Sequence, residues 1–200
     1  MSEALRIILP AYLAVFFLVV LLGRSYLVWK RTGINPYVVS KSDRPIDFVE
    51  ACYRVPVALI LVTTLAYVFL PGVYRFAVPV TWLETDVVRY AGLFLMLSAL
   101  VWTAIAQMQM GASWRIGIDP KHETELVERG LFKVSRNPIF VGMRLALWGV
   151  FLAVPNAVTL TAVALADVLM QTQVRLEEEF LLRTHGADYD SYRSRVRRWI

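Results

Sequence analysis

The sequence predicts an all-α fold, a polytopic membrane helix bundle with five transmembrane helices, of which the last two form a C-terminal helical hairpin. Three observations predict this class. Apolar residues make up 58% of the 200 residues, the mean hydropathy is +0.54, and long apolar runs alternate with short charged segments. Soluble domains contain about half apolar residues, so we expect a single integral membrane domain over residues 1–200.

The first three helices are predicted from long apolar runs, since about 20 helical residues cross the roughly 30 Å hydrocarbon core of a bilayer. These runs cover about residues 7–26, 55–74 and 87–107. The first run lacks a small-residue cleavage site, so we expect a retained span rather than a signal peptide. Residues 1–107 therefore form the part that holds the first three spans.

The predicted hairpin occupies residues 138–172, an apolar stretch that is too long for one span. Pro155 and Asn156 interrupt it near the middle, and proline does not continue the interior of a helix. We therefore expect two slightly short helices joined by a tight turn. Pro138 is expected to be the first residue of the fourth helix and Asn137 its N-cap, because proline gives up no helical hydrogen bond there.

Lysine and arginine residues mark one side of the membrane. They are concentrated after the first span, after the third span and in the C-terminal tail. Because cytoplasmic loops carry an excess of positive charge, we expect a multi-pass protein of the cell membrane with its N-terminus outside and its C-terminus in the cytoplasm. Tryptophans near the predicted interfaces are expected to anchor the bundle there; they are Trp29, Trp82, Trp114 and Trp199.

Charge and cysteine content argue against two kinds of partner. The net charge is +5, but the basic residues flank apolar runs, so they are expected to contact lipid headgroups rather than nucleic acid. Cys52 is the only cysteine, and His122 and His185 are the only histidines. These residues do not form a metal-ligand pattern. We therefore expect membrane lipid as a partner, and neither nucleic acid nor metal.

Two polar blocks with defined spacing bracket the hairpin. The first consists of Gly130, Phe132, Arg136, Asn137, Pro138, Phe140 and Gly142, and the second of Glu177, Glu178, Leu181, Gly186, Tyr189, Tyr192 and Val196. In this order the blocks resemble the isoprenylcysteine carboxyl methyltransferase family, over about residues 100–200. The resemblance implies methyl transfer from S-adenosylmethionine to a lipophilic acceptor, with S-adenosylhomocysteine as the product.

The resemblance also implies roles for individual residues. Residues 108–200 would form the cofactor-binding catalytic part, whose two blocks enclose the cofactor on the cytoplasmic side. Asn137 stands where the family has a histidine and can still donate and accept hydrogen bonds, while Phe132 and Phe140 stand where it has tyrosines and serve as packing walls. The implied cofactor-binding residues are Leu131, Arg136, Asn137, Pro138, Phe140, Gly142, Glu178 and Tyr189, and the implied catalytic residues are Arg175 and Glu177.

The methyl acceptor and two rival functions stay open. Arg175 would orient a carboxylate, and Glu177 or Glu178 would take the proton from an amine. Isoprenylcysteine, a phospholipid amine, a quinone-like lipid and another hydrophobic acid therefore all fit. The arginine and proline before the fourth helix and the tyrosine-rich end also resemble NADPH-dependent membrane sterol or steroid reductases. A non-enzymatic membrane scaffold would use the same helices without a pocket.

Two charged residues are expected inside the apolar hairpin. Arg144 and Asp167 lie equally far from the turn at Pro155 and Asn156, so both should lie at the same depth, where a salt bridge would relieve both charges. A stripe of small residues argues the other way if it faces the fifth helix, because Arg144 would then point elsewhere, toward the cofactor carboxylate. The stripe consists of Gly142, Ala146, Gly149 and Ala153.

Overall fold

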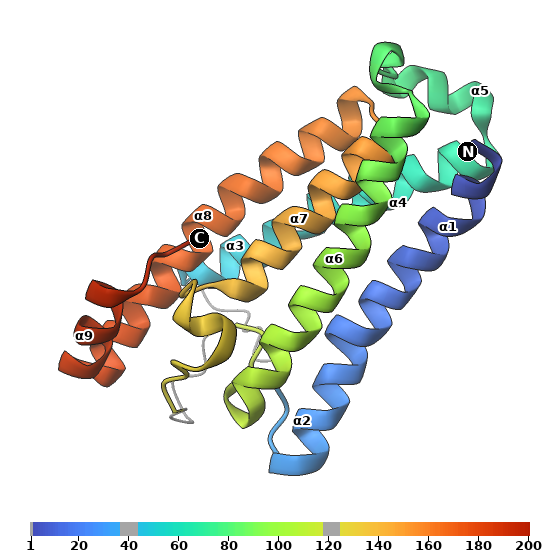
Figure 1. Ribbon diagram of the computed structural model, residues 1–200. Coiled ribbons are helices and arrows are strands. Elements are labelled where there is room, and N and C mark those ends of the chain that lie inside the picture. The colour runs from blue at the N-terminus through green and yellow to red at the C-terminus, as the bar shows by residue number, and fades with distance from the viewer. Residues whose placement is uncertain (1, 37–43, 118–124) are drawn as a thin grey trace.

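Long helices lie side by side in the computed structural model, which describes residues 2–36, 44–117 and 125–200 (Figure 1). Within those ranges the chain is helical and contains no β-strand. His122 lies outside the described residues. The α-helices are α1 (Ser2–Phe16), α2 (Arg24–Thr32), α3 (Pro45–Cys52), α4 (Arg54–Phe69), α5 (Pro71–Tyr74), α6 (Asp86–Met110), α7 (Pro138–Ala153), α8 (Ala157–His185) and α9 (Ala187–Arg195).

Four helical stretches are long and apolar enough to cross a membrane, and they confirm the prediction of an all-α membrane bundle. A π-helix, Phe17–Gly23, joins α1 to α2 in the first stretch. The shorter apolar helix α7 has 16 residues, about 24 Å at the α-helical rise, so a fifth crossing stays a prediction. The four stretches are Glu3–Thr32, Pro45–Phe69, Asp86–Ser113 and Ala157–His185.

The second predicted span is wrong at its end. The structure ends α4 at Phe69, and α5 begins at Pro71 as a separate short helix. Pro71 lacks the backbone N–H that would continue α4, and its ring restricts the preceding residue, Leu70, which leaves the helical conformation with φ −132° and ψ 63°. The chain therefore turns away from the span about five residues earlier than the hydropathy predicts.

The predicted turn of the hairpin is confirmed. Asn156 is fully buried and caps α8, because its side-chain oxygen accepts a hydrogen bond from the Thr159 N–H at 2.9 Å. The Thr159 hydroxyl in turn accepts from the Asn156 N–H at 3.3 Å, which completes a capping box. The loop between α5 and α6 holds this turn in place, since the Val80 N–H of that loop donates to the Pro155 carbonyl at 2.9 Å.

The stripe of small residues on α7 packs against α6 and not against α8. A Cβ added at Gly142 would lie 2.1 Å from Thr103 Oγ1 of α6, and one added at Gly149 would lie 2.7 Å from Met96 Cγ of the same helix. Close contact between the two backbones therefore requires glycine at both positions. The condition under which Arg144 would point elsewhere, that this stripe faces the fifth helix, is therefore not met, and the opposite side of α7 is left to meet α8.

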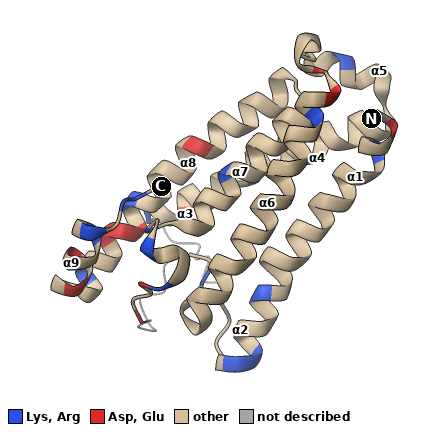
Figure 2. Cartoon of the chain, viewed as in Figure 1, with Lys and Arg blue, Asp and Glu red and all other residues tan. Residues whose placement is uncertain are grey.

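Charged residues are concentrated at one end of the bundle (Figure 2). We call this the charged end; it is formed by α2, residues 111–117, residues 125–137 and α9 (Figure 1). The N-terminus and α5 lie at the opposite end (Figure 1). The two sequence blocks that bracket the hairpin meet at the charged end, because α8 runs back past the start of α7.

Candidate functional site

Glu178 is the point at which the two sequence blocks meet. It lies on α8 and is 9% exposed. Its carboxylate accepts hydrogen bonds from Arg136 Nε and Nη2, each at 3.2 Å, and from Asn137 Nδ2 at 3.1 Å. Arg198 donates to it as well, with the shortest contact at 2.8 Å from Nη2. Two guanidinium groups thus compensate one buried carboxylate through charge-assisted bonds.

The segment before α7 is shaped by its glycine and proline. Gly130 has φ +60°, a conformation that L side chains rarely adopt, and it opens the short 3₁₀ helix Gly130–Lys133. The Leu131 N–H donates to Gln109 Oε1 of α6 at 2.7 Å. At the other end Pro138 is buried as the first residue of α7, and its carbonyl accepts from Trp102 Nε1 at 2.8 Å. These contacts fix Arg136 and Asn137 between two anchored points.

Asn137 is at the predicted position but does not make the predicted bond. It directly precedes α7, yet its side chain makes no cap hydrogen bond. Its amide nitrogen instead donates to Glu178 Oε1 at 3.1 Å and to the Arg198 carbonyl at 3.2 Å. These two bonds turn the amide toward α8 and the C-terminal residues and away from the backbone N–H groups of the first turn of α7, which a capping oxygen would have to reach.

The tyrosines of the second block line the inner side of α9. Tyr192 donates its hydroxyl to the Phe132 carbonyl at 2.7 Å, which ties α9 to the first block. Tyr189 is 1% exposed, and its hydroxyl has no hydrogen-bond partner within the described ranges. Burial raises the pKa of Tyr189 to about 12, so this hydroxyl keeps its proton at neutral pH. The site therefore contains one buried donor that is not used.

Glu177 and Glu178 have different partners although they are neighbours in sequence, because successive residues of a helix point about 100° apart. Glu177 accepts a hydrogen bond from Gln173 Nε2 at 2.8 Å. On this side α8 packs against α3 and α4. Both carboxylate oxygens of Glu50 and the hydroxyl of Tyr53 are buried there and have no hydrogen-bond partner among the described residues. Sequence reasoning missed Glu50 and Tyr53, which lie before the two blocks.

Arg175 is not brought together with Glu178. It is exposed, and its Nη1 donates to the Gln171 carbonyl at 2.6 Å and to Gln171 Oε1 at 2.9 Å. Residues three apart lie only about 60° apart around a helix, so position on α8 does not separate the two. Their side chains diverge, because Arg175 turns back to Gln171 whereas Glu178 bonds to Arg136 and Arg198. The catalytic role of Arg175 stays a prediction.

Gly142 and Phe140, which were also predicted to bind the cofactor, mainly pack against other parts of the bundle. Gly142 is pressed against Thr103 of α6, as described above, and Phe140 is half-buried on the first turn of α7. Neither makes a polar contact with Glu178 among the described atoms. Their assignment to cofactor binding therefore stays a prediction as well.

Arg144 and Asp167 form a salt bridge with 2.5 Å between Arg144 Nη2 and Asp167 Oδ1. This contact decides between the two expectations, since Arg144 points to α8 and pairs with the acid. The guanidinium also lies over the ring of Trp199, 3.8 Å from its centroid. Trp199, which was expected to anchor the bundle at the membrane interface, covers the guanidinium of this pair between α7 and α8.

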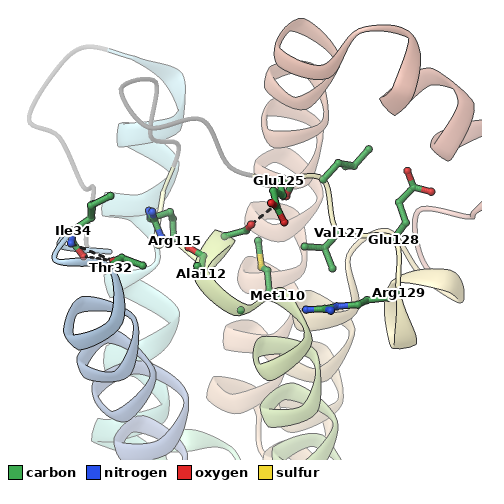
Figure 3. A pocket seen from close by; sticks show the side chains of 12 residues that line it. Thr32, Ile34, Met110, Ala112, Arg115, Glu125, Val127, Glu128 and Arg129 are labelled. Carbon is green, nitrogen blue, oxygen red and sulfur yellow. Dashed lines mark hydrogen bonds between the residues drawn. The ribbon is translucent and has the colours of Figure 1, made fainter.

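A hollow of about 640 Å³ lies at the charged end, between the end of α2, the end of α6 and residues 125–129. Figure 3 shows Arg115, Glu125 and Arg129 around it. None of the residues predicted to bind the cofactor or to act in catalysis lines it. The described residues also contain no group of three or more histidine, cysteine, aspartate or glutamate side chains arranged to hold a metal ion.

The fold and the site define a helical integral membrane protein whose two C-terminal blocks close on a buried charged centre. The chain matches the phospholipid methyltransferase family over residues 87–188, slightly more than half of its length. It belongs to this family and is a membrane methyltransferase. The match runs from the first turn of α6 to α9 and ends before Tyr189. No curated protein matches the chain.

Proposed function

We propose that this protein transfers a methyl group from S-adenosylmethionine to a lipophilic acceptor, and that the charged end faces the cytoplasm. The observation that carries the proposal is the meeting of both sequence blocks at Glu178, through Arg136 and Asn137. Membership of the phospholipid methyltransferase family supports the reaction type. The polar cofactor would enter at the charged end, and the acceptor would arrive laterally from the bilayer.

The residues at the charged end fit this cofactor. S-adenosylmethionine has an ammonium group, a carboxylate and ribose hydroxyls, so its site needs buried donors and acceptors that the protein does not use itself. The Tyr189 hydroxyl meets this requirement. Tyr189 would bind the cofactor directly, and Arg136, Asn137 and Glu178 would form the rigid charged wall beside it.

The protein's part in the reaction is alignment, exclusion of water and removal of a proton. When bound, S-adenosylmethionine supplies a methyl carbon on a cationic sulfur, which keeps the bonding electrons as the acceptor's lone pair takes that carbon. An amine acceptor then has one proton to lose, and Glu177 is the carboxylate that we propose receives it. The carboxylate oxygens of Glu50, on the same side, have no hydrogen-bond partner among the described residues, and this carboxylate would repel a carboxylate acceptor, which supports an amine. If the acceptor were a carboxylate, Arg175 would orient it.

Binding of S-adenosylhomocysteine tests this function, with two tyrosine variants as a matched pair. Tyr189→Phe removes a hydroxyl that has no partner in the described part of the chain, so it should leave the unliganded melting temperature unchanged and weaken cofactor binding about tenfold, which is roughly 1.4 kcal/mol. Tyr192→Phe removes the bond to the Phe132 carbonyl, so it should lower stability by about 1 kcal/mol and leave cofactor affinity nearly unchanged.

Isothermal titration of the detergent-solubilised protein measures both affinities. Equal affinities for wild type and Tyr189→Phe would remove Tyr189 from the cofactor site. Binding of NADPH in place of S-adenosylhomocysteine would favour the reductase, and binding of neither would favour the scaffold.

A further inference from the structure

The last five residues, 196–200, run back from α9 across the first sequence block. Val196 leaves α9 with φ −119° and ψ 134°, an extended conformation. The family match ends at residue 188, so these residues lie beyond it. We call them the C-terminal segment, and their contacts are made largely with residues predicted to bind the cofactor.

Hydrogen bonds to its backbone carbonyls hold the C-terminal segment in register. The Arg136 N–H donates to the Arg197 carbonyl at 2.9 Å. Arg136 Nη1 donates to the Val196 carbonyl at 3.0 Å. Ser135 Oγ and Asn137 Nδ2 both donate to the Arg198 carbonyl at 3.2 Å. The first three residues of the segment are therefore bonded to Ser135, Arg136 and Asn137.

Arg198 is the partner of Glu178 on the solvent side. Its Nε lies 3.1 Å from each carboxylate oxygen and its Nη2 lies 2.8 Å from Oε2. The Arg198 side chain is 33% exposed, whereas that of Arg136 is 11% exposed. The hydrogen bond with Glu178 raises the pKa of Arg198, so its charge is permanent. Arg136 cannot take over this position, because its Nη1 is held by two backbone carbonyls.

We propose that Arg198, which the C-terminal segment holds beside the cofactor site, is a positioning residue: it fixes the carboxylate of Glu178, so that the wall of the site next to Tyr189 has the shape that cofactor binding needs. The inference rests on the proposed function. Trp199 extends the same wall, since its ring covers the guanidinium of Arg144, which is itself paired with Asp167. The segment thus connects the charged centre at Glu178 to the salt bridge inside the hairpin.

Arg197 provides a matched control for Arg198. Its side chain is exposed and makes no hydrogen bond or ion pair in the described part of the chain, while its carbonyl contact with Arg136 survives any side-chain change. Arg197→Ala and Arg198→Ala therefore remove the same charge from adjacent positions. They differ in the contact with Glu178 alone.

The experiment measures the affinity of purified full-length variants for S-adenosylhomocysteine, together with KM for cofactor and acceptor. Arg198→Ala should weaken cofactor binding tenfold or more and raise KM for S-adenosylmethionine, with KM for the acceptor unchanged. Arg198→Lys should lie between wild type and Arg198→Ala, because an ammonium keeps the charge but loses the guanidinium fork. Arg197→Ala should bind as wild type does.

A double variant shows whether Arg198 acts through Glu178. If it does, Arg198→Ala combined with Glu178→Gln should bind no more weakly than Glu178→Gln alone, because the two effects are not additive within one network. Additive losses would overturn the positioning role, as would equal losses in Arg197→Ala and Arg198→Ala. If Arg198→Ala does not fold, the affinity of Arg198→Lys for S-adenosylhomocysteine is the test. An affinity equal to that of wild type would overturn the inference.

Different results would overturn the proposed methyltransferase function and the positioning role of Arg198. Wild-type protein that does not bind S-adenosylhomocysteine overturns both. Loss of binding in Tyr189→Phe with full binding in Arg198→Ala overturns the inference and leaves the proposed function in place.

Discussion

Replacing Glu178 by alanine should destabilise the unliganded protein, because it leaves two guanidinium groups at the charged end without the carboxylate that compensates their charge. The side chain of Glu178 is 10% exposed and that of Arg136 is 11% exposed, so this pair is shielded from water. Removing one partner of a buried ion pair costs about 3–5 kcal/mol. Arg198 is 33% exposed and regains hydration, which places the expected cost near the lower end, about 3 kcal/mol.

The next residue along α8 is the control. Glu179 pairs with Arg183, but their side chains are 57% and 73% exposed, and such surface pairs contribute about 0–1 kcal/mol. For a chain of this length about 1 kcal/mol corresponds to roughly 2–4 °C in melting temperature. We therefore expect Glu178→Ala to lower the melting temperature by about 6–12 °C and Glu179→Ala by less than about 4 °C.

Thermal unfolding in detergent without ligand measures both variants side by side. Similar small shifts would refute the reasoning, since they would mean that Glu178 is not the acceptor of a buried network. A large shift in Glu179→Ala would contradict it equally, because that carboxylate faces solvent.

Three further predictions concern packing, catalysis and topology. Gly149→Leu should lower stability by about 1–3 kcal/mol in the same unfolding assay, because a Cβ there would meet Met96 Cγ at 2.7 Å; an unchanged melting temperature would contradict the close α6–α7 contact. Arg175→Lys should lower turnover about tenfold with cofactor affinity unchanged if Arg175 orients a carboxylate acceptor, and unchanged turnover would remove it from the site. Reporter fusions at Ile200 and near Leu83 should report opposite sides of the membrane, with Ile200 cytoplasmic; the same side for both would refute the topology.

The helices could be predicted from sequence because their signals are local. Apolar length sets where α6 and α8 lie, and Pro155 followed by Asn156 marks the turn because a proline and an N-cap act within a few residues. The end of α4 was misplaced for a related reason. Hydropathy continues to Tyr74, whereas Pro71 stops the helix before the apolar run is over.

The arrangement of the site could be predicted only in part. Spacing and resemblance identified Arg136, Asn137 and Glu178, which the fold brings together. Arg198 was missed because it is one of several arginines in the tail, and sequence does not show which of them turns inward. The partner of Arg144 was open for a similar reason. A stripe of small residues predicts close helix contact, but it does not specify which neighbouring helix makes that contact.

The most direct test of the account is methyl transfer by the purified protein. Wild-type protein in detergent would be incubated with methyl-tritiated S-adenosylmethionine and an extract of total membrane lipid, and the label would be counted in the organic phase. We predict that wild type labels the lipid fraction and that Tyr189→Phe labels it far more slowly at limiting cofactor. Absence of lipid labelling by folded wild-type protein, together with NADPH-dependent reduction of a sterol-like lipid, would contradict the central claim.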